Sequence, residues 1–357
     1  MSRFLNEKFK SLEAYTPGEQ PKDMKYIKLN TNESPFPPSK GVVDAISADE
    51  VGKLRLYPDP EGSELKSALA ELYGVKKENV FLSNGSDEIL NFSFMAFFDK
   101  KGVVFPSISY GFYKVYADLY GLNYEQIPLC EDFSINYKDY VGVEKNVVIA
   151  NPNAPTGMTL TLSEVEEIVK SNSDNIVLID EAYVDFGGES CVGLTKKYDN
   201  LLVCCTYSKS RSLAGARLGF AIGNSEIIAD LEKIKYSTNP YNINRLTMTA
   251  GLAAVRDNDY YMNNCRIIEE NREFTKVELE GLGFRVLPSK ANFIFAESDD
   301  IDGGTLYSDL RQRGILVRHF TSERIKNFNR ITIGTLDDMK ALVSAVSDIL
   351  KSKGELK

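Results

Sequence analysis

The chain has 357 residues, too many for one ordinary compact domain, and suits a large domain joined to a smaller one. Its net charge of −9 argues against nucleic acid as a partner, because proteins that bind the phosphate backbone carry basic patches. No apolar run approaches the roughly 20 residues of a membrane span. The single histidine, His319, disfavours a metal site or a catalytic triad that depends on histidine.

The N-terminal segment contains no apolar stretch followed by a small-residue cleavage site, so we expect no signal peptide. Five cysteines, an odd number without CxxC spacing, are typical of reduced thiols and predict a cytoplasmic protein. The proline-rich stretch TNESPFPPSK, residues 31–40, predicts an extended arm rather than a hinge.

Between about residues 80 and 225, short β-rich apolar runs alternate with amphipathic stretches, which predicts βαβ units and a mostly parallel sheet. The runs occupy residues 79–83, 102–106, 146–152, 175–183, 201–209 and 219–223. Residues 161–172 place Leu162, Val165, Ile168 and Val169 on one face, and predict a crossover helix with Thr161 or Ser163 as its N-cap.

The remainder of the chain predicts an α+β domain. A helical stretch begins near residue 226, and a long amphipathic segment continues to about residue 280. Apolar runs at 284–297, 315–320 and 329–334 then alternate with helical segments at 303–314 and 336–353.

Polar residues follow four of the apolar runs at the point where each run ends. They are Gly85, Ser86 and Asp87; Asn151 and Asn153; Asp180 and Tyr183; and Ser208 and Lys209. Ligands of open α/β sheets bind beyond the carboxyl ends of the strands, so these residues are expected to line one site. The alternative is ordinary loop and cap chemistry at each place.

Lys209 and Arg217 lie eight residues apart in TYSKSRSLAGARLG, residues 206–219. Two like charges this close require an anion or water between them. The segment therefore indicates an anion-binding site after the strand.

Several motifs, in this order and spacing, resemble the pyridoxal-phosphate-dependent aminotransferases of fold type I, and more narrowly the histidinol-phosphate aminotransferase family. The central three are NPNAPTG (151–157), DEAYVDF (180–186) and YSKSRSLAGARLG (207–219). Others are YTPGE (15–19), LNTNESPFPPS (29–39), RLYPDPEG (55–62), LSNGSDEIL (82–90), PSISYGFY (106–113), PYNINRL (240–246) and NRITIGT (329–335).

The resemblance implies a fold type I α/β transferase. Its large domain, residues 36–248, would hold a mostly parallel seven-stranded sheet flanked by helices. An N-terminal arm, residues 1–35, and a smaller α+β domain, residues 249–357, would complete it.

The resemblance also implies roles in binding pyridoxal 5′-phosphate. Lys209 would carry the cofactor as an imine and move the proton, Asp180 would keep the ring nitrogen charged, and Tyr183 would bond the phenolic oxygen. The phosphate would be the anion beside Arg217. Its other ligands would be Gly85, Ser86, Asp87, Thr206 and Ser208. Tyr110 would stack on the ring; the alternative for Tyr110 is a core tyrosine.

Two further features depend on the family. Tyr57 would reach the phosphate in the neighbouring subunit's site, which implies a homodimer, whereas LYPDPEG alone would indicate only a turn. The family commonly has an asparagine directly before Pro155, where this chain has Ala154. Either Asn153 substitutes for it, or Tyr183 alone contacts the phenolic oxygen.

On the substrate side, Arg330 and Arg318 match arginines that bind the substrate's anionic end, and paired arginines suit a dianionic phosphate. A solvated strand-end charge is the alternative for Arg318. Tyr15 and Asn32 would complete the pocket. We therefore expect a ping-pong aminotransferase of histidine biosynthesis that uses L-histidinol phosphate and 2-oxoglutarate. The alternatives are an aromatic amino-acid aminotransferase and threonine-phosphate decarboxylase, a lyase on the same scaffold.

Overall fold

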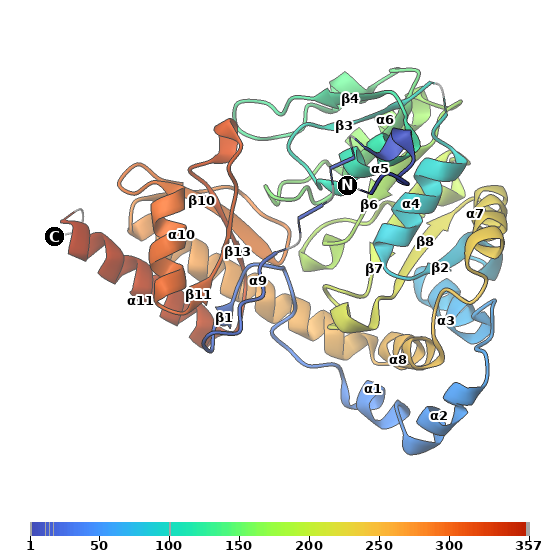
Figure 1. The fold of residues 1–357 in the computed structure, drawn as a ribbon, viewed down its shortest axis with the longest axis horizontal. Coiled ribbons are helices and arrows are strands. Elements are labelled where there is room, and N and C mark those ends of the chain that lie inside the picture. Colours follow the sequence, from blue (N-terminus) through green and yellow to red (C-terminus); the bar gives the residue numbers. More distant parts are fainter. Residues whose placement is uncertain (1, 11, 14, 17, 100, 355–357) are drawn as a thin grey trace.

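The computed structural model describes residues 2–10, 12–13, 15–16, 18–99 and 101–354. Pro17 of the YTPGE motif and residues 1 and 355–357 of the predicted domains lie outside the described residues. Within this part of the chain, a larger α/β unit and a smaller α+β unit lie side by side (Figure 1). No helix among these residues is both long enough and apolar enough to cross a membrane.

A seven-stranded sheet forms the centre of the larger unit, as far as the structure describes the chain. In spatial order its strands are β2 (Val80–Ser83), β8 (Gly219–Gly223), β7 (Leu201–Thr206), β6 (Val177–Asp180), β5 (Asn146–Ala150), β3 (Val103–Pro106) and β4 (Tyr124–Ile127). Strand β8 pairs antiparallel with both neighbours, and the other neighbouring strands pair in parallel. The predicted mostly parallel sheet is confirmed.

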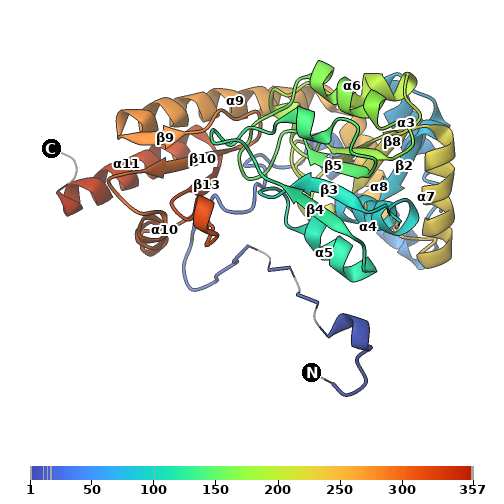
Figure 2. The ribbon, with the colours of Figure 1, turned by 90° about the horizontal axis from the view of Figure 1, so that it is seen from above.

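Helices cover both faces of this sheet, as Figure 2 shows. One face packs against α1 (Lys40–Ala45), α3 (Ser63–Tyr73), α6 (Leu162–Ser171) and α8 (Arg245–Arg256). The other packs against α4 (Ser86–Ala96), α5 (Phe112–Tyr120) and α7 (Ser225–Thr238). Because both faces are covered, β2, β3, β5, β6, β7 and β8 are buried along their whole length, which explains why their sequences are continuous apolar runs.

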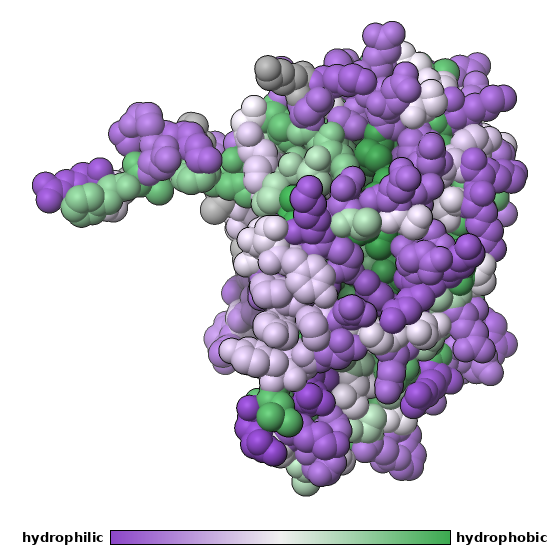
Figure 3. Space-filling view, turned by 90° about the vertical axis from the view of Figure 1, so that its right-hand side faces the viewer, coloured by the Kyte–Doolittle hydropathy of each residue, from purple (hydrophilic) through white to green (hydrophobic). Residues whose placement is uncertain are grey.

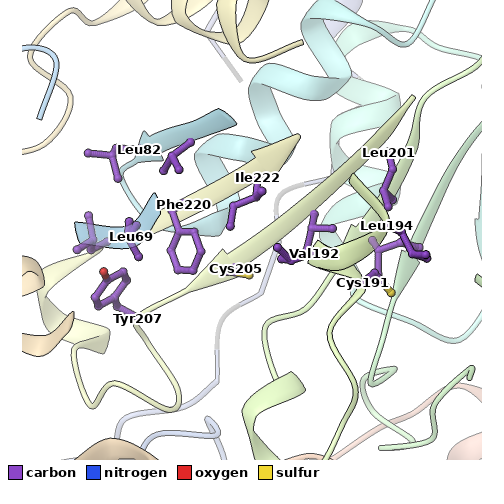
Figure 4. Packing of buried hydrophobic residues seen from close by; sticks show 14 of the residues in the cluster. Leu69, Leu82, Cys191, Val192, Leu194, Leu201, Cys205, Tyr207, Phe220 and Ile222 are labelled. Atoms are coloured by element: carbon purple, nitrogen blue, oxygen red, sulfur yellow. The ribbon is translucent and has the colours of Figure 1, made fainter. Parts of the chain in front are cut away.

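Local sequence explains where the crossover helix α6 begins. The Thr161 hydroxyl accepts from the Glu164 N–H, and the Glu164 carboxylate accepts from the Thr161 N–H, a reciprocal capping box. Thr161 rather than Ser163 is therefore the N-cap, and the predicted helix is confirmed. Figure 4 shows part of the core on this face of the sheet, with Leu82, Leu201, Phe220 and Ile222 contributed by the strands.

The smaller unit is built on an antiparallel sheet of four strands within the described residues. Its strands are β12 (Arg318–His319), β13 (Asn329–Thr332), β10 (Phe293–Ser298) and β9 (Phe284–Val286), and its helices are α9 (Asn258–Gly281), α10 (Gly303–Gln312) and α11 (Leu336–Lys353). Helix α9 joins the two units, since Tyr261 belongs to the core of the larger and Ile268 to that of the smaller. The predicted boundary at residue 248 falls inside α8 and stays a prediction.

The N-terminal arm packs on the smaller unit. Strand β1 (Ile27–Lys28) pairs in parallel with β11 (Ile315–Leu316), and the Glu19 carboxylate lies 3.2 Å from Arg311 Nε. Residues 2–10 stand away from the body in Figure 2 and project from a largely hydrophilic face in Figure 3. After the two short helices α1 and α2 (Ala48–Gly52), the chain continues along the edge of the larger unit to the start of α3.

Candidate active site

A cavity of about 400 Å³ lies at the edge of the large sheet where β2, β5, β6 and β7 end. Because the carboxyl ends of parallel strands meet at one edge, residues from four separate motifs converge there. The lining includes the predicted residues Ser86, Asp87, Tyr110, Asp180, Tyr183, Thr206, Ser208, Lys209 and Arg217. Thr31, Glu33 and Ala154 also line it.

Asp180, the last residue of β6, is 5% exposed. Its Oδ2 accepts from the Tyr113 hydroxyl at 2.9 Å, and its Oδ1 accepts from the Ala182 N–H at 3.2 Å. Burial raises the pKa of Asp180 to about 6. A carboxyl withdrawn from water in this way favours a cationic partner across the cavity.

Sequence reasoning missed Tyr113. It is the second residue of α5, whereas Tyr110 lies before the Gly111 N-cap, so the two are not a helical pair. The spacing of Tyr113, Tyr116 and Ala117 could have indicated that Tyr113 faces the sheet. It could not show that Tyr113 bonds Asp180, which lies 67 residues further along the chain.

Lys209 lies on the loop that follows β7. Its Nζ donates to the Thr31 carbonyl oxygen at 3.2 Å and lies 5.7 Å from the centre of the Tyr183 ring. The loop is fixed on the far side, where the Ser210 hydroxyl donates to Asp185 at 2.5 Å and Arg211 donates to Asn258 at 2.7 Å. The amine is therefore held at the cavity wall by a neutral carbonyl.

The end of the cavity near β2 carries anion-binding groups. Helix α4 begins at Ser86, and its first N–H groups point toward this end. Arg217, with φ +54°, places Nη2 2.9 Å from Asp87 Oδ2 and donates from Nη1 to Ser208 Oγ at 3.3 Å. A Cβ on Gly219 would lie 2.6 Å from the Ser86 nitrogen, so glycine is required for β8 to approach the helix start.

Tyr110 forms one wall of the cavity. Its hydroxyl donates to Asp87 Oδ1 at 2.8 Å, and burial raises the pKa of Tyr110 further above its ordinary value. Across from it, Tyr15 of the arm makes an edge contact with the Tyr110 ring, with centroids 6.2 Å apart. The ring is thereby fixed at both its hydroxyl and its edge.

A second cavity, of about 360 Å³, lies where the arm and the smaller unit meet the larger unit. It shares Thr31, Tyr110, Ala154, Tyr183 and Lys209 with the first cavity, so the two spaces adjoin at the lysine. The predicted residues Tyr15, Asn32, Arg318 and Arg330 all line it.

Arg318 and Arg330 are direct partners in the β12–β13 ladder, so both side chains leave the same face of the sheet. Arg330 is enclosed, and its Nη2 donates to the Asn30 carbonyl at 3.0 Å. Burial lowers the pKa of the Arg330 guanidinium, and no carboxylate of the described residues lies within 4 Å of it. Among the residues that the structure describes, none forms a hydrogen bond with the buried Nε of Arg330. The pair is arranged to receive an anion.

Three predicted residues lie outside both linings. Gly85, with φ +75°, gives Arg217 its space, because a Cβ there would lie 2.6 Å from Arg217 Nη2. Asn153 is buried and turned away: its amide donates to the Ile108 carbonyl at 3.0 Å, and its Oδ1 accepts from Ser109 at 2.8 Å. Tyr57 is 77% exposed and stacks on Tyr241.

Residues 24–346 match the family model described as aminotransferase class I and II. The chain is 54% identical over 354 residues to a histidinol-phosphate aminotransferase of Brachyspira hyodysenteriae, covering 99% of this chain and 100% of that protein. It superposes with a TM-score of 0.83 on the histidinol-phosphate aminotransferase of Clostridium acetobutylicum, at 26% identity over 91% of this chain and 99% of that one. The histidinol-phosphate aminotransferase of Sinorhizobium meliloti, whose structure is in complex with pyridoxal 5′-phosphate, also superposes with a TM-score of 0.83, at 23% identity over 92% of each chain. This match shows that the two chains share a fold.

Proposed function

The chain belongs to the class I and II aminotransferase family, which depends on pyridoxal phosphate, and on this premise we propose that it transfers an amino group between L-histidinol phosphate and 2-oxoglutarate in histidine biosynthesis. The observation that carries the choice of substrate is the Arg318–Arg330 pair on one face of the small sheet. Like charges opposite each other in a ladder destabilise it unless an anion lies between them, and a phosphate dianion suits two guanidinium groups.

The residues of the first cavity fit the cofactor. The start of α4, the hydroxyls of Thr206 and Ser208 and the guanidinium of Arg217 would hold its phosphate. Asp180 would face its ring nitrogen, and the Tyr110 ring would cover its ring. When bound, the cofactor supplies an aldehyde that reacts with amines and a ring that accepts the electron pair released at the substrate carbon.

The chain's own groups then have separable tasks. The Lys209 amine, where the two cavities adjoin, removes the proton from the substrate carbon and returns it one position away. The Asp180 carboxylate keeps a proton on the ring nitrogen, since burial strengthens its attraction for a cation. The Tyr183 hydroxyl donates to the phenolic oxygen, a task in which Asn153 takes no part because its amide is bonded elsewhere.

A panel of amino donors tests the substrate. We expect purified protein reconstituted with pyridoxal phosphate to turn over L-histidinol phosphate with 2-oxoglutarate far faster than it turns over phenylalanine. Preferred use of phenylalanine would instead favour the aromatic aminotransferase. Release of CO₂ from threonine phosphate without an oxo-acid acceptor would overturn the transferase assignment in favour of the lyase.

We also propose a homodimer in which Tyr57 reaches the neighbouring site. Apolar side chains are exposed along residues 43–57, including Val43 at 62%, Leu54 at 50% and Leu56 at 47%. Tyr57 is nonetheless held in place: its carbonyl accepts from Arg245 at 3.2 Å, and its ring lies 4.5 Å from that of Tyr241. A side chain that is exposed but fixed suits insertion into a partner.

Subunit mixing tests this dimer. Co-refolding the Lys209→Ala and Tyr57→Ala variants should produce hybrids in which one site carries both changes and the other carries neither. Random pairing at equal amounts leaves roughly a quarter of the sites intact, so activity should rise well above the sum of the two variants. If activity stays at that sum, Tyr57 acts within its own subunit.

From the cysteine pattern we further propose that the enzyme works in the cytoplasm.

A further inference from the structure

Asn32 of the N-terminal arm connects the two walls of the site through its side-chain amide. The residue is 1% exposed, and its Nδ2 donates to the Tyr183 hydroxyl oxygen at 3.0 Å. The two residues lie 151 positions apart in the sequence. Asn32 lines the predicted substrate pocket, but each polar group of its side chain already has a partner within the protein.

The surrounding hydrogen bonds fix which way the Asn32 amide points. The Asn32 backbone N–H donates to Thr332 Oγ1 at 3.0 Å, and the one proton of that hydroxyl is donated to Asn32 Oδ1, also at 3.0 Å. The reversed amide would leave the Thr332 proton facing an N–H group. The Asn32 carbonyl accepts from Asn292 at 3.0 Å, so the backbone is held as well.

This orientation decides where the Tyr183 proton goes. A tyrosine hydroxyl has one proton, and here its oxygen accepts from Asn32, so the proton is free to point elsewhere. Tyr183 lines both cavities. Ala154, on the same wall, offers no side-chain donor, and Asn153 is turned toward Ile108 and Ser109.

We propose that Asn32 is a positioning residue that aims the Tyr183 proton at the phenolic oxygen of the bound cofactor by donating its own amide hydrogen to the tyrosine oxygen. The inference rests on the proposed function, because the acceptor belongs to the cofactor. Since Ala154 cannot supply a second donor, the hydrogen bond from Tyr183 depends on the Asn32–Thr332 pair.

Asn32→Asp is the sharpest test, because it keeps the side-chain shape and replaces the donor by an acceptor. The Tyr183 proton should then turn to the introduced carboxylate and leave the cofactor. The readout is the pH titration of the visible absorbance of the holoenzyme without substrate. Losing a donor at the phenolic oxygen leaves more negative charge beside the nitrogen through which Lys209 would hold the cofactor. The pH midpoint of the absorbance change, which reports the titration of this nitrogen, should therefore rise by about one pH unit.

Two further variants separate this effect from the charge of the introduced carboxylate. Thr332→Val adds no charge and releases the amide to rotate, so it should raise the midpoint in the same direction by a smaller amount. In a Tyr183→Phe background, Thr332→Val should not move the midpoint further, because the proton being aimed is gone. Asn32→Asp should move it much less than it does in the wild type, since only the charge of the carboxylate remains. Circular dichroism of each holoenzyme checks that it is folded.

Equal shifts from Asn32→Asp with and without the Tyr183 hydroxyl would overturn the inference, since the effect would then be that of charge alone. Unchanged midpoints in both Asn32→Asp and Thr332→Val would overturn it as well. A midpoint that ignores Tyr183→Phe would also overturn it, since the Tyr183 proton would then not reach the phenolic oxygen. A protein that develops no visible absorbance with pyridoxal phosphate would instead refute the proposed function on which the inference rests.

Discussion

The two walls of the site are built in different ways. The wall on the large sheet takes its side chains from loops that directly follow β2, β5, β6 and β7. The wall on the arm and the smaller unit depends on contacts between distant segments, such as Thr31 with Lys209 and Asn32 with Thr332, the latter 300 residues apart. The first wall carries the groups of the chemistry, and the second holds the substrate anion and orients those groups.

This comparison predicts that changes in the sheet wall lower kcat, whereas changes in the arm and small-unit wall raise KM. The largest effect is expected for Lys209→Arg, which keeps the charge but replaces the amine by a guanidinium that cannot act as a base. Turnover should fall by at least about 10⁴-fold, and the visible absorbance of the bound cofactor should be lost. The exposed Lys76, changed in the same way, serves as the control. Residual turnover near that of the wild type would exclude Lys209 as the base.

Asp180→Asn should give the next largest effect. The amide can still pack beside Tyr113 but cannot hold a proton on the ring nitrogen, so kcat should fall on the order of 10²- to 10³-fold with little change in KM. Tyr113→Phe is the matched control, because it keeps the carboxylate and removes one hydrogen bond, and should cost about tenfold or less. Equal losses in the two variants would mean that the carboxylate's charge is not what matters.

The contrast between the walls also explains what could be predicted from the sequence. Lys209, Asp180 and Tyr183 were predicted to share a site because each follows an apolar run, and parallel strands end at one edge. The direction of Asn153 could not be predicted, since it depends on how the loop after β5 turns. The bond from Asn32 to Tyr183 could not be predicted either, because it requires the arm, the large sheet and β13 to be assembled first.

The arginine pair sharpens the comparison on the second wall. Arg318→Gln should raise KM for histidinol phosphate by about 10- to 100-fold, since it removes one of two charge-assisted contacts to the phosphate. It should change KM for 2-oxoglutarate much less than Arg330→Gln does, because the Arg330 guanidinium is the more enclosed of the two. Steady-state kinetics with each substrate varied in turn measures both. A fall in kcat at unchanged KM would place Arg318 with the sheet wall and contradict the division of roles.

The smallest effect on turnover is expected one residue beyond Asp180. Successive residues of a strand face opposite sides, so Glu181 lies behind the site, where its carboxylate accepts from Ser190 Oγ at 2.6 Å and from the Cys191 N–H at 2.5 Å. Burial raises the pKa of Glu181 to about 7, and the charge of Asp185 adds to the rise. The same carboxyl titrates near 4.5 once unfolded.

Between about pH 4.5 and about pH 7 the folded protein therefore binds more protons than the unfolded chain, and the free energy of unfolding declines as pH rises through this range. At about 1.4 kcal/mol per pKa unit, the displacement corresponds to about 3 kcal/mol. Glu181→Gln should remove that part of the decline and leave kcat within about twofold. Urea denaturation of the holoenzymes at several pH values measures it, with the exposed Glu280→Gln as control. If wild type and Glu181→Gln lose stability in parallel as pH rises, then Glu181 is ionised in the folded protein, and its burial behind the site does not hold a proton.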